Sequence, residues 1–411
     1  MSVVAQDRAA SGQRPRVELA DIFTRHADAY CETHHVRPIQ RKVVRAIISC
    51  RTAALGGHRE WCRRCGYERY LYHSCRNRHC PKCQSLAKAS WLADRQRELL
   101  PVPYFHNVFT LPHELNALIL WNEKNQRALL NLLFQAASKT LLEFGKNNLG
   151  GKIGFTMVLH TWDQQLRPHF HLHVVLASGA VAHDGSRWIA GGSKYLFPVR
   201  ALSKVFRAKY LDGLAKLIKQ KNIELPPHLA ANGSSGVCPI QIRRLRRKPW
   251  VVYSKPPFSG PRKLLDFLGR YTHRVAISNH RIVSNDKGQV CFTYRDRRDE
   301  DRVKTASISA EEFINRFLKH VLPSGFLRIR HYGFLANCIK RESLAQCREL
   351  LGVPPSMPVE ESLQTAAEQM QLFLGLDITC CPRCHGPLSR ELLLPVPISR
   401  IHGPQENCRD P

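Results

Sequence analysis

The sequence predicts an α+β fold, in which an antiparallel sheet with helices on one face follows a helical, cysteine-rich segment. From residue 104 onward, strand-like and helix-like stretches come in the order strand, helix, strand, strand, helix. Two of these strands, 154–160 and 168–175, are separated by a short polar turn, and strands joined so closely pair antiparallel. Before residue 100, apolar residues recur at helical spacing and cysteines come in close pairs.

The chain is strongly basic. Its 411 residues suffice for two or three domains, and its 43% apolar content is that of a globular protein. Lys and Arg number 62 against 33 Asp and Glu, a net charge of +29 that indicates a polyanionic partner, most simply nucleic acid. No long apolar run or Lys-rich amphipathic terminus favours a membrane instead. Residues 1–16 lack the apolar core of a signal peptide and are expected to form a flexible basic tail.

Residues 17–100 are expected to form a helical zinc-binding domain that docks on DNA. Apolar residues at helical spacing predict core-facing helices within 17–50 and a further helix over 84–100. Pro101 and Pro103 end that pattern, and we place the domain boundary there. Arginines surround the cysteines of this segment. They favour DNA docking, with an ordinary solvated surface as the alternative.

Two Cys-x-x-Cys pairs, separated by 14 residues, predict a closed structural zinc site in this domain. Cys75, His73 and His79 lie beside the pairs, so one of them could replace a ligand or serve a second ion. Fifteen cysteines in so long a chain, several at metal-type spacing, favour a reducing compartment over a disulfide framework. The four ligands predicted by this spacing are Cys62, Cys65, Cys80 and Cys83.

The elements after residue 101 follow from pattern changes. Residues 104–111 and 154–160 read as strands, 114–146 as a long helical stretch and 199–221 as a basic amphipathic helix. Residues 226–236 are rich in Pro, Asn, Gly and Ser, which is typical of a loop. The chain after 350 opens with prolines typical of a linker. It ends in a tail with one more Cys-x-x-Cys pair, half of a possible zinc site.

Three histidines alternate with apolar residues along the strand at 168–175. Successive side chains of a strand point to opposite faces, so His169, His171 and His173 share one face while the apolar row enters a core. Two imidazoles at that spacing can chelate one divalent ion. The alternative is a half-buried strand with incidental histidines.

Two basic stretches predict contacts to a nucleic-acid backbone. The first lies beside Trp250 and Tyr253, either of which could stack on a base, although a solvated charge run would look the same. In the second, helical spacing places Tyr271 on the packed side of a helix, between Arg270 and Arg274, which could hold a phosphate. The arginines of the first stretch are Arg243, Arg244, Arg246 and Arg247.

A histidine metal site, a helical tyrosine and a basic surface together indicate phosphate chemistry. A divalent ion polarises a phosphate, a tyrosine oxygen attacks and becomes joined to it, and arginines screen the backbone. Attack by a metal-bound water would instead give plain hydrolysis, which the sequence leaves open.

The chain resembles the HUH (His-hydrophobe-His) superfamily of single-strand endonucleases. Within it, the chain is similar to the zinc-bearing rolling-circle transposases of bacterial insertion sequences, the insertion sequence ninety-one family. The resemblance covers most of the chain. It is carried by the Cys-x-x-Cys pair at 62–65, HSCRNRHCPKCQ at 73–84, FTLP at 109–112, LHTW at 159–162, HFHLH at 169–173, RYTHRVAISN at 270–279, HVLPSGF at 320–326 and RHYGFLA at 330–336.

The resemblance implies roles for individual residues. The metal ligands would be His171 and His173, with His169 assisting or orienting them. His160, or a Gln or Asn near the tyrosine helix, would be the third ligand. The nucleophile would be Tyr271. Phe267 stands where many members carry a further tyrosine, so the chain resembles the one-tyrosine branch.

The implied fold is an HUH endonuclease-like sheet with a ferredoxin- or RRM-like core over 101–350, after the zinc-binding segment and before a 351–411 linker and tail. The implied activity is insertion-sequence transposition through single-stranded DNA, with a 5′-phosphotyrosine intermediate, Mg²⁺ or Mn²⁺ at the histidines and Zn²⁺ at the cysteines. The expected location is the bacterial cytoplasm, at the nucleoid. No P-loop motif is present, so a helicase would come from the host.

The sequence is compatible with two other functions. A rolling-circle replication initiator or relaxase would use the same chemistry, but the zinc domain and the distal motifs favour a transposase. A non-catalytic, zinc-dependent DNA-binding regulator would explain the charge and the cysteines, yet it would leave Tyr271 and the histidine strand without a role.

Overall fold

The computed structural model describes residues 16–397 except 193–194, 228–238, 259, 261–262, 265–266, 268, 270–275, 297–298, 355–366, 369 and 372–376. Its centre is a five-stranded sheet in the order β13-β5-β6-β3-β9, in which each neighbouring pair is antiparallel. The predicted α+β class with an antiparallel sheet is confirmed. The strands are β3 (Tyr104–Thr110), β5 (Gly154–Trp162), β6 (Pro168–Ala177), β9 (Val252–Lys255) and β13 (Ile329–Gly333).

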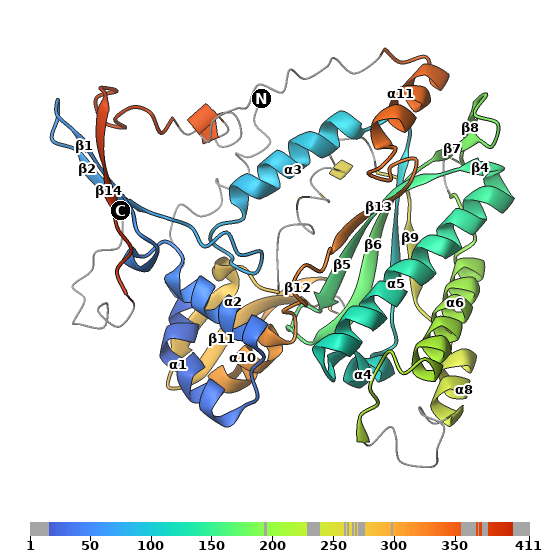
Figure 1. Ribbon diagram of the computed structural model, residues 1–411, viewed down its shortest axis with the longest axis horizontal. Helices are drawn as coiled ribbons and strands as arrows, with labels where there is room; N and C mark the ends of the chain where they lie inside the picture. The colour runs from blue at the N-terminus through green and yellow to red at the C-terminus, as the bar shows by residue number, and fades with distance from the viewer. Residues whose placement is uncertain are drawn as a thin grey trace.

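Helices cover the apolar face of this sheet, and Figure 1 shows α5 and α6 lying across it. The apolar row of β6, Phe170, Leu172 and Val174, is buried there against the helices, as the alternation of the histidine strand predicts. Leucines along α5 supply much of the same core. The helices are α4 (Asn116–Leu120), α5 (Glu123–Phe144), α6 (Val199–Lys219) and α8 (Pro239–Arg247).

A second core joins the beginning of the chain to a later part of it. Residues 19–50 and 276–321 bury their apolar side chains together. Phe23 packs edge-on against Phe317 with ring centroids 5.3 Å apart. The segments on either side of residue 100 therefore share a hydrophobic core. Its elements are α1 (Leu19–Thr33), α2 (Pro38–Ser49), β10 (Ile282–Asp286), β11 (Gln289–Asp296), β12 (Arg302–Ser309) and α10 (Ala310–Leu318).

A small sheet brings the two ends of the described chain together. Its order is β14-β1-β2, so the tail strand β14 (Leu388–Leu393) pairs with β1 (Gly57–Cys62), which in turn pairs with β2 (Glu68–Tyr72). Figure 1 shows these three strands side by side, away from the central sheet. The remaining elements are α3 (Ser85–Glu98), β4 (Gly151–Lys152), β7 (Gly179–Ala182), β8 (Trp188–Ala190) and α11 (Lys340–Leu350).

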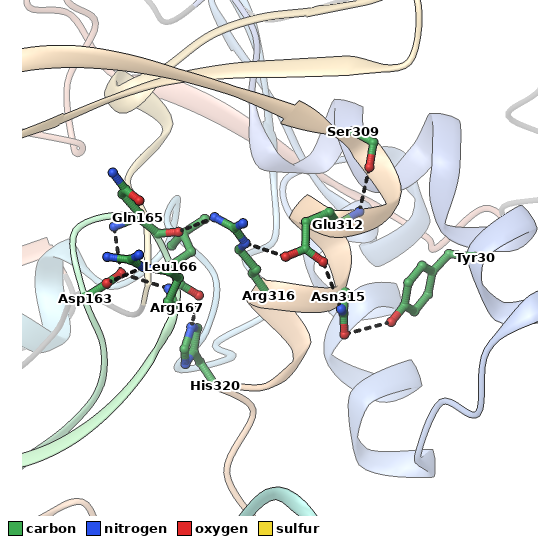
Figure 2. A network of polar contacts seen from close by, with 10 residues as sticks. All are labelled: Tyr30, Asp163, Gln165, Leu166, Arg167, Ser309, Glu312, Asn315, Arg316 and His320. Carbon is green, nitrogen blue, oxygen red and sulfur yellow. Dashed lines mark hydrogen bonds and ion pairs between the residues drawn. The ribbon is translucent and has the colours of Figure 1, made fainter. Parts of the chain in front are cut away.

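The turn between β5 and β6 is fastened to the second core (Figure 2). Leu166 is fully buried in that core with a left-handed φ of 63°, a conformation that non-glycine residues adopt rarely. Its carbonyl accepts a hydrogen bond from Nε2–H of His320 at 2.9 Å, and the carbonyl of Gln165 accepts one from Arg316 at 3.1 Å. Asp163 Oδ1 accepts two backbone N–H groups of the turn at 2.8 Å. These contacts fix the hairpin that carries the histidines.

Within the described part of the chain, every helix is too short or too polar to cross a membrane.

Candidate functional site

The central sheet brings three histidines together on the face opposite α5 and α6. His160 on β5 lies directly across the strand pair from His171 on β6, so both side chains point to one face, and His173 follows on that face two residues later. Their ligand atoms lie within 4.8 Å of one another, and all three side chains are buried. Nε2 of His171 and Nε2 of His173 are 3.1 Å apart.

Hydrogen bonds orient the two imidazoles of β6. Nδ1–H of His171 donates to the carbonyl of His169 at 2.9 Å, which leaves Nε2 unprotonated and facing the cluster. Nδ1 of His173 lies 2.8 Å from Nε2 of His106, a buried residue of β3. Histidines that bind metals are usually fixed in this way through the second ring nitrogen.

No sequence pattern singles out His106. It lies opposite Val175 in the β3–β6 pairing, and Val175 shares its face with His173. Only the strand register places His106 beside the cluster, and the sequence did not supply that register. His169 lies outside the three-histidine group, with its ring 5.3 Å from His113 and 4.7 Å from His171. It contributes its backbone carbonyl to the group.

Phe267 packs on this face of the sheet. The buried Phe267 ring lies 4.2 Å from the ring of His106 and 5.8 Å from that of His173. Two residues later, a side chain added at Gly269 would meet α3 atoms of Lys88 and Leu92 at 3.0 Å. The predicted nucleophile, Tyr271, lies outside the described residues, as do Arg270 and Arg274.

A further histidine on the same face is fixed in its neutral form. Nδ1–H of His331 on β13 bonds Thr156 Oγ1 at 2.8 Å, and its Nε2 accepts from Arg95 of α3 at 3.0 Å. Burial, followed by the charges of Arg95 and Lys340, lowers the pKa of His331 to about 4. This contact ties α3 to the sheet beside the histidine cluster.

The cysteines form two groups, and neither is the predicted one. Cys62 and Cys65 lie with Cys381 and Cys384, whereas Cys80 and Cys83 lie with Cys50 and Cys75. The β1–β2 hairpin explains the division. The first pair lies at its tip, and β2 returns the chain to the base before Cys75. Five paired residues at about 3.3 Å each place tip and base roughly 17 Å apart, too far for one ion.

The surplus residues of the cysteine segment also separate. Cys75 belongs to the group at the hairpin base, with its Sγ 3.7 Å from that of Cys83. His79 is in neither cysteine group found among the described residues. It is buried, and its Nδ1 lies 3.0 Å from Oδ1 of Asn77. The spacing of the cysteines does not indicate Cys50 as a ligand, because Cys50 has no close cysteine neighbour in the chain. The pair of cysteines in the tail predicts only half of a zinc site by itself.

The basic stretch at 243–250 is exposed on α8, but its tryptophan is not. Trp250 is 4% exposed and packs against Phe206 and Tyr210, so the interpretation of Trp250 as a base-stacking residue is wrong. Its indole N–H bonds the carbonyl of Leu245 at 3.1 Å, which closes the end of α8 onto the core. Tyr253 on the edge strand β9 is 50% exposed. The exposed arginines are Arg243, Arg244, Arg246 and Arg247, of which Arg246 pairs with Asp212 at 3.0 Å.

Comparison with known proteins identifies the family. Residues 22–111 match the family model "Transposase zinc-binding domain" of the IS91 type, and residues 154–343 match the model "Putative transposase". A protein of Sinorhizobium fredii (strain NBRC 101917 / NGR234), "Putative transposase y4qJ", is 45% identical over 90% of this chain and 93% of its own length. The chain belongs to the IS91 family of transposases.

A second, more distant relative is also a transposase. The "Transposase for insertion sequence element IS801" of Pseudomonas savastanoi pv. phaseolicola is 28% identical over 85% of this transposase and 82% of its own length. A metal-free structure of the conjugative relaxase TrwC with oriT DNA shares 15% identity, covers 40% of this chain and 70% of that one, and superposes with a TM-score of only 0.22. The group of Cys50, Cys75, Cys80 and Cys83 (the Cys50 group) lies inside the zinc-domain match. The group of Cys62, Cys65, Cys381 and Cys384 (the Cys62 group) lies only half inside it.

Proposed function

We propose that this transposase cuts single-stranded DNA at the ends of its insertion sequence with Tyr271, and that it rejoins the strands in rolling-circle transposition. The observation that carries the proposal is the buried cluster of His160, His171 and His173 beside the ring of Phe267. Tyr271 follows Phe267 by four residues.

The histidine cluster suits a divalent ion. Three imidazole nitrogen donors converge, and the group found among the described residues contains no carboxylate. Imidazole donors suit transition ions, whereas Mg²⁺ prefers oxygen. Of the two ions predicted for this site, we therefore expect Mn²⁺ to bind more tightly than Mg²⁺. Such an ion would supply polarisation of a scissile phosphate oxygen.

The protein's own residues prepare this site. The carbonyl of His169 holds His171 in the tautomer whose Nε2 carries no proton. His106 does the same for His173 when Nδ1–H of His173 donates to it. The rings are fixed by strands and not by loops, so the donors need no rearrangement before they bind.

The proposed nucleophile then does the covalent chemistry. The Tyr271 oxygen bonds to the phosphorus and its proton passes to solvent, while the 3′ oxygen leaves with the bonding pair and takes up a proton. The 5′-phosphotyrosine ester keeps the phosphate available for attack by another 3′-OH, which joins the strands. The exposed arginines of α8 and the exposed ring of Tyr253 would hold the strand.

A covalent-adduct assay tests the proposal. The full-length protein is incubated with Mn²⁺ and 5′- or 3′-labelled single-stranded DNA from an element end, and the products are separated on a denaturing gel. We expect a protein–DNA adduct with the 3′-labelled fragment, and its loss in Tyr271→Phe and in His171→Ala. Tyr195→Phe, at an exposed tyrosine, is the matched control and should form the adduct normally.

Two results would count against the proposal. Cleavage at the wild-type rate in Tyr271→Phe, without any adduct, would favour a metal-bound water as nucleophile. Binding of element-end DNA with no cleavage under Mn²⁺ would favour the non-catalytic regulator.

A further inference from the structure

The tail of the chain carries a pair of cysteines that meets the hairpin tip near the other end. Cys384 Sγ lies 3.4 Å from Cys62 Sγ, and Cys381 Sγ lies 3.5 Å from Cys65 Sγ. All four sulfurs lie within 4.8 Å of one another. A tetrahedron with zinc–sulfur bonds of about 2.3 Å has sulfurs about 3.8 Å apart, so these sulfurs are spaced as zinc ligands.

The two turns that carry these cysteines have the same backbone hydrogen bonds. In the hairpin, N–H of Gly66 donates to the carbonyl of Cys62 at 3.0 Å, and N–H of Cys62 donates to Tyr67 at 2.8 Å. In the tail, the residues at the same offsets repeat both bonds. N–H of His385 donates to the carbonyl of Cys381 at 2.9 Å, and N–H of Cys381 donates to the carbonyl of Gly386 at 2.9 Å.

The fourth residue after the first cysteine has a left-handed backbone in both turns. It is Gly66 with a φ of 69° in the hairpin and His385 with a φ of 56° in the tail. Two turns of one conformation, 316 residues apart from Cys65 to Cys381, therefore face each other as matching halves of one four-thiolate site.

Strand pairing brings the tail into place. β14 pairs with β1 from Gly57↔Leu393 to Cys62↔Leu388, a register that ends at the cysteine turns. Glu60 in β1 is fully buried between Arg69 of β2 at 2.7 Å and Arg390 of β14 at 2.8 Å. Undocking the tail would remove Arg390, one of the two cations that pair with Glu60. A buried carboxylate without its cationic partners is strongly unfavourable.

Apolar burial cannot hold this strand by itself. Most residues of β14 are half-exposed or exposed, and Leu392 is 62% exposed. A short strand with so little buried apolar surface is marginal in water. Metal binding at a site formed only in the docked state adds its binding free energy to docking.

We infer that Cys62, Cys65, Cys381 and Cys384 bind a second zinc ion, separate from the Cys50 group, and that this ion fastens the C-terminal tail to the N-terminal hairpin. The site lies only half inside the matched zinc-binding domain. It does not depend on the proposed cleavage chemistry.

Zinc content measured by mass spectrometry of the purified full-length protein tests this inference. Cys381→Ser/Cys384→Ser should contain one zinc ion fewer per chain than the wild type. Because the result is a difference between proteins, any zinc at the histidine cluster cancels. Cys380→Ser is the matched control, since Cys380 neighbours the site but is not in the group, and it should keep the full content. Cys381→His should also keep it, because imidazole can replace a thiolate on zinc.

Limited trypsin digestion gives a second readout. Cleavage after Arg390 should be slow in the wild type and in Cys380→Ser, and at least tenfold faster in the double variant. Unchanged zinc content in the double variant would overturn the inference, because the tail would not bind the ion. Loss of both cysteine-bound ions would equally contradict it, because the two sites would not be separate.

Discussion

The histidine cluster and the two cysteine groups hold potential metal ligands in opposite ways. The three histidines lie on neighbouring strands of the central sheet, whose other face packs on a large apolar core. The cysteines lie on turns and at the ends of short elements, and each group joins segments that are separate in the sequence. We therefore expect an ion at the histidines to serve chemistry, and ions at the cysteines to serve folding.

The largest effect expected from this comparison is at the Cys50 group. Cys83→Ser removes one of four thiolates, and structural zinc contributes on the order of 10 kcal/mol to the folding of small zinc modules. We expect loss of one zinc ion and a fall in the free energy of unfolding of several kcal/mol, measured by chemical denaturation. Cys338→Ser, at an exposed cysteine, is the control and should change neither. Equal stability of the two variants would contradict a structural role for this group.

The next effect concerns the turn that fastens the histidine hairpin. Leu166→Ala empties a fully buried site and should lower the free energy of unfolding by about 2–5 kcal/mol. Leu142→Ala, at a leucine of α5 that is 37% exposed, should cost much less. Urea unfolding measures both. If the two variants lose equal stability, the turn is not held by the second core.

A pH-dependent effect arises at His320, which bonds the same turn. Burial lowers the pKa of His320 to about 4, against smaller opposing effects of the hydrogen bond to the Leu166 carbonyl and of the charge of Asp163. The unfolded state takes up a proton near pH 6.5 and the folded state only near pH 4, so this stabilisation is present above pH 6.5 and is lost as the pH falls toward 4.

The loss attributable to His320 should approach about 3 kcal/mol at pH 4. His320→Gln keeps a donor for the Leu166 carbonyl but cannot titrate. Urea unfolding at pH 7.5 and pH 4.5 should therefore show a smaller acid loss in His320→Gln than in the wild type. The same acid loss in both proteins would show that other groups cause it.

The smallest effect on stability is expected at the metal-facing histidines. His171→Ala should lower the free energy of unfolding by only about 1 kcal/mol, because the β6 backbone and its apolar row remain. His171→Ala should nevertheless no longer bind Mn²⁺. The measurement is the electron paramagnetic resonance signal of the free ion, which the wild type reduces by binding and the variant should leave unchanged. A loss of stability as large as that of Cys83→Ser would remove the distinction between the two kinds of site.

The same contrast explains what the sequence could predict. His171 and His173 lie two residues apart on one strand, and His160 lies on the strand joined to it by a short turn, so local periodicity is enough to bring them together. The Cys62 group depends on two segments that are 316 residues apart from Cys65 to Cys381, and the Cys50 group depends on a cysteine 25 residues before Cys75. Spacing along the chain pairs Cys62 with Cys80 instead.

Trp250 and His106 show similar limits of the sequence. The basic run predicts that Trp250 or Tyr253 stacks on a base, but the Trp250 indole packs against Phe206 and Tyr210. His106 needed the register of β3 against β6, which a single sequence does not reveal. The strands β3, β5 and β6, the helix α5 and the antiparallel pairing of β5 with β6, by contrast, follow from periodicity and a short connection.

The most direct test of the proposed activity locates the covalent bond. The adduct formed with single-stranded element-end DNA and Mn²⁺ is digested with nuclease and trypsin, and the modified peptide is identified by mass spectrometry. Because Arg270 and Arg274 bracket Tyr271, trypsin should release a four-residue peptide ending at Arg274. We predict a nucleotide joined through its 5′ phosphate to Tyr271 in that peptide. A nucleotide on any other residue, or cleaved DNA with no modified peptide, would contradict the account.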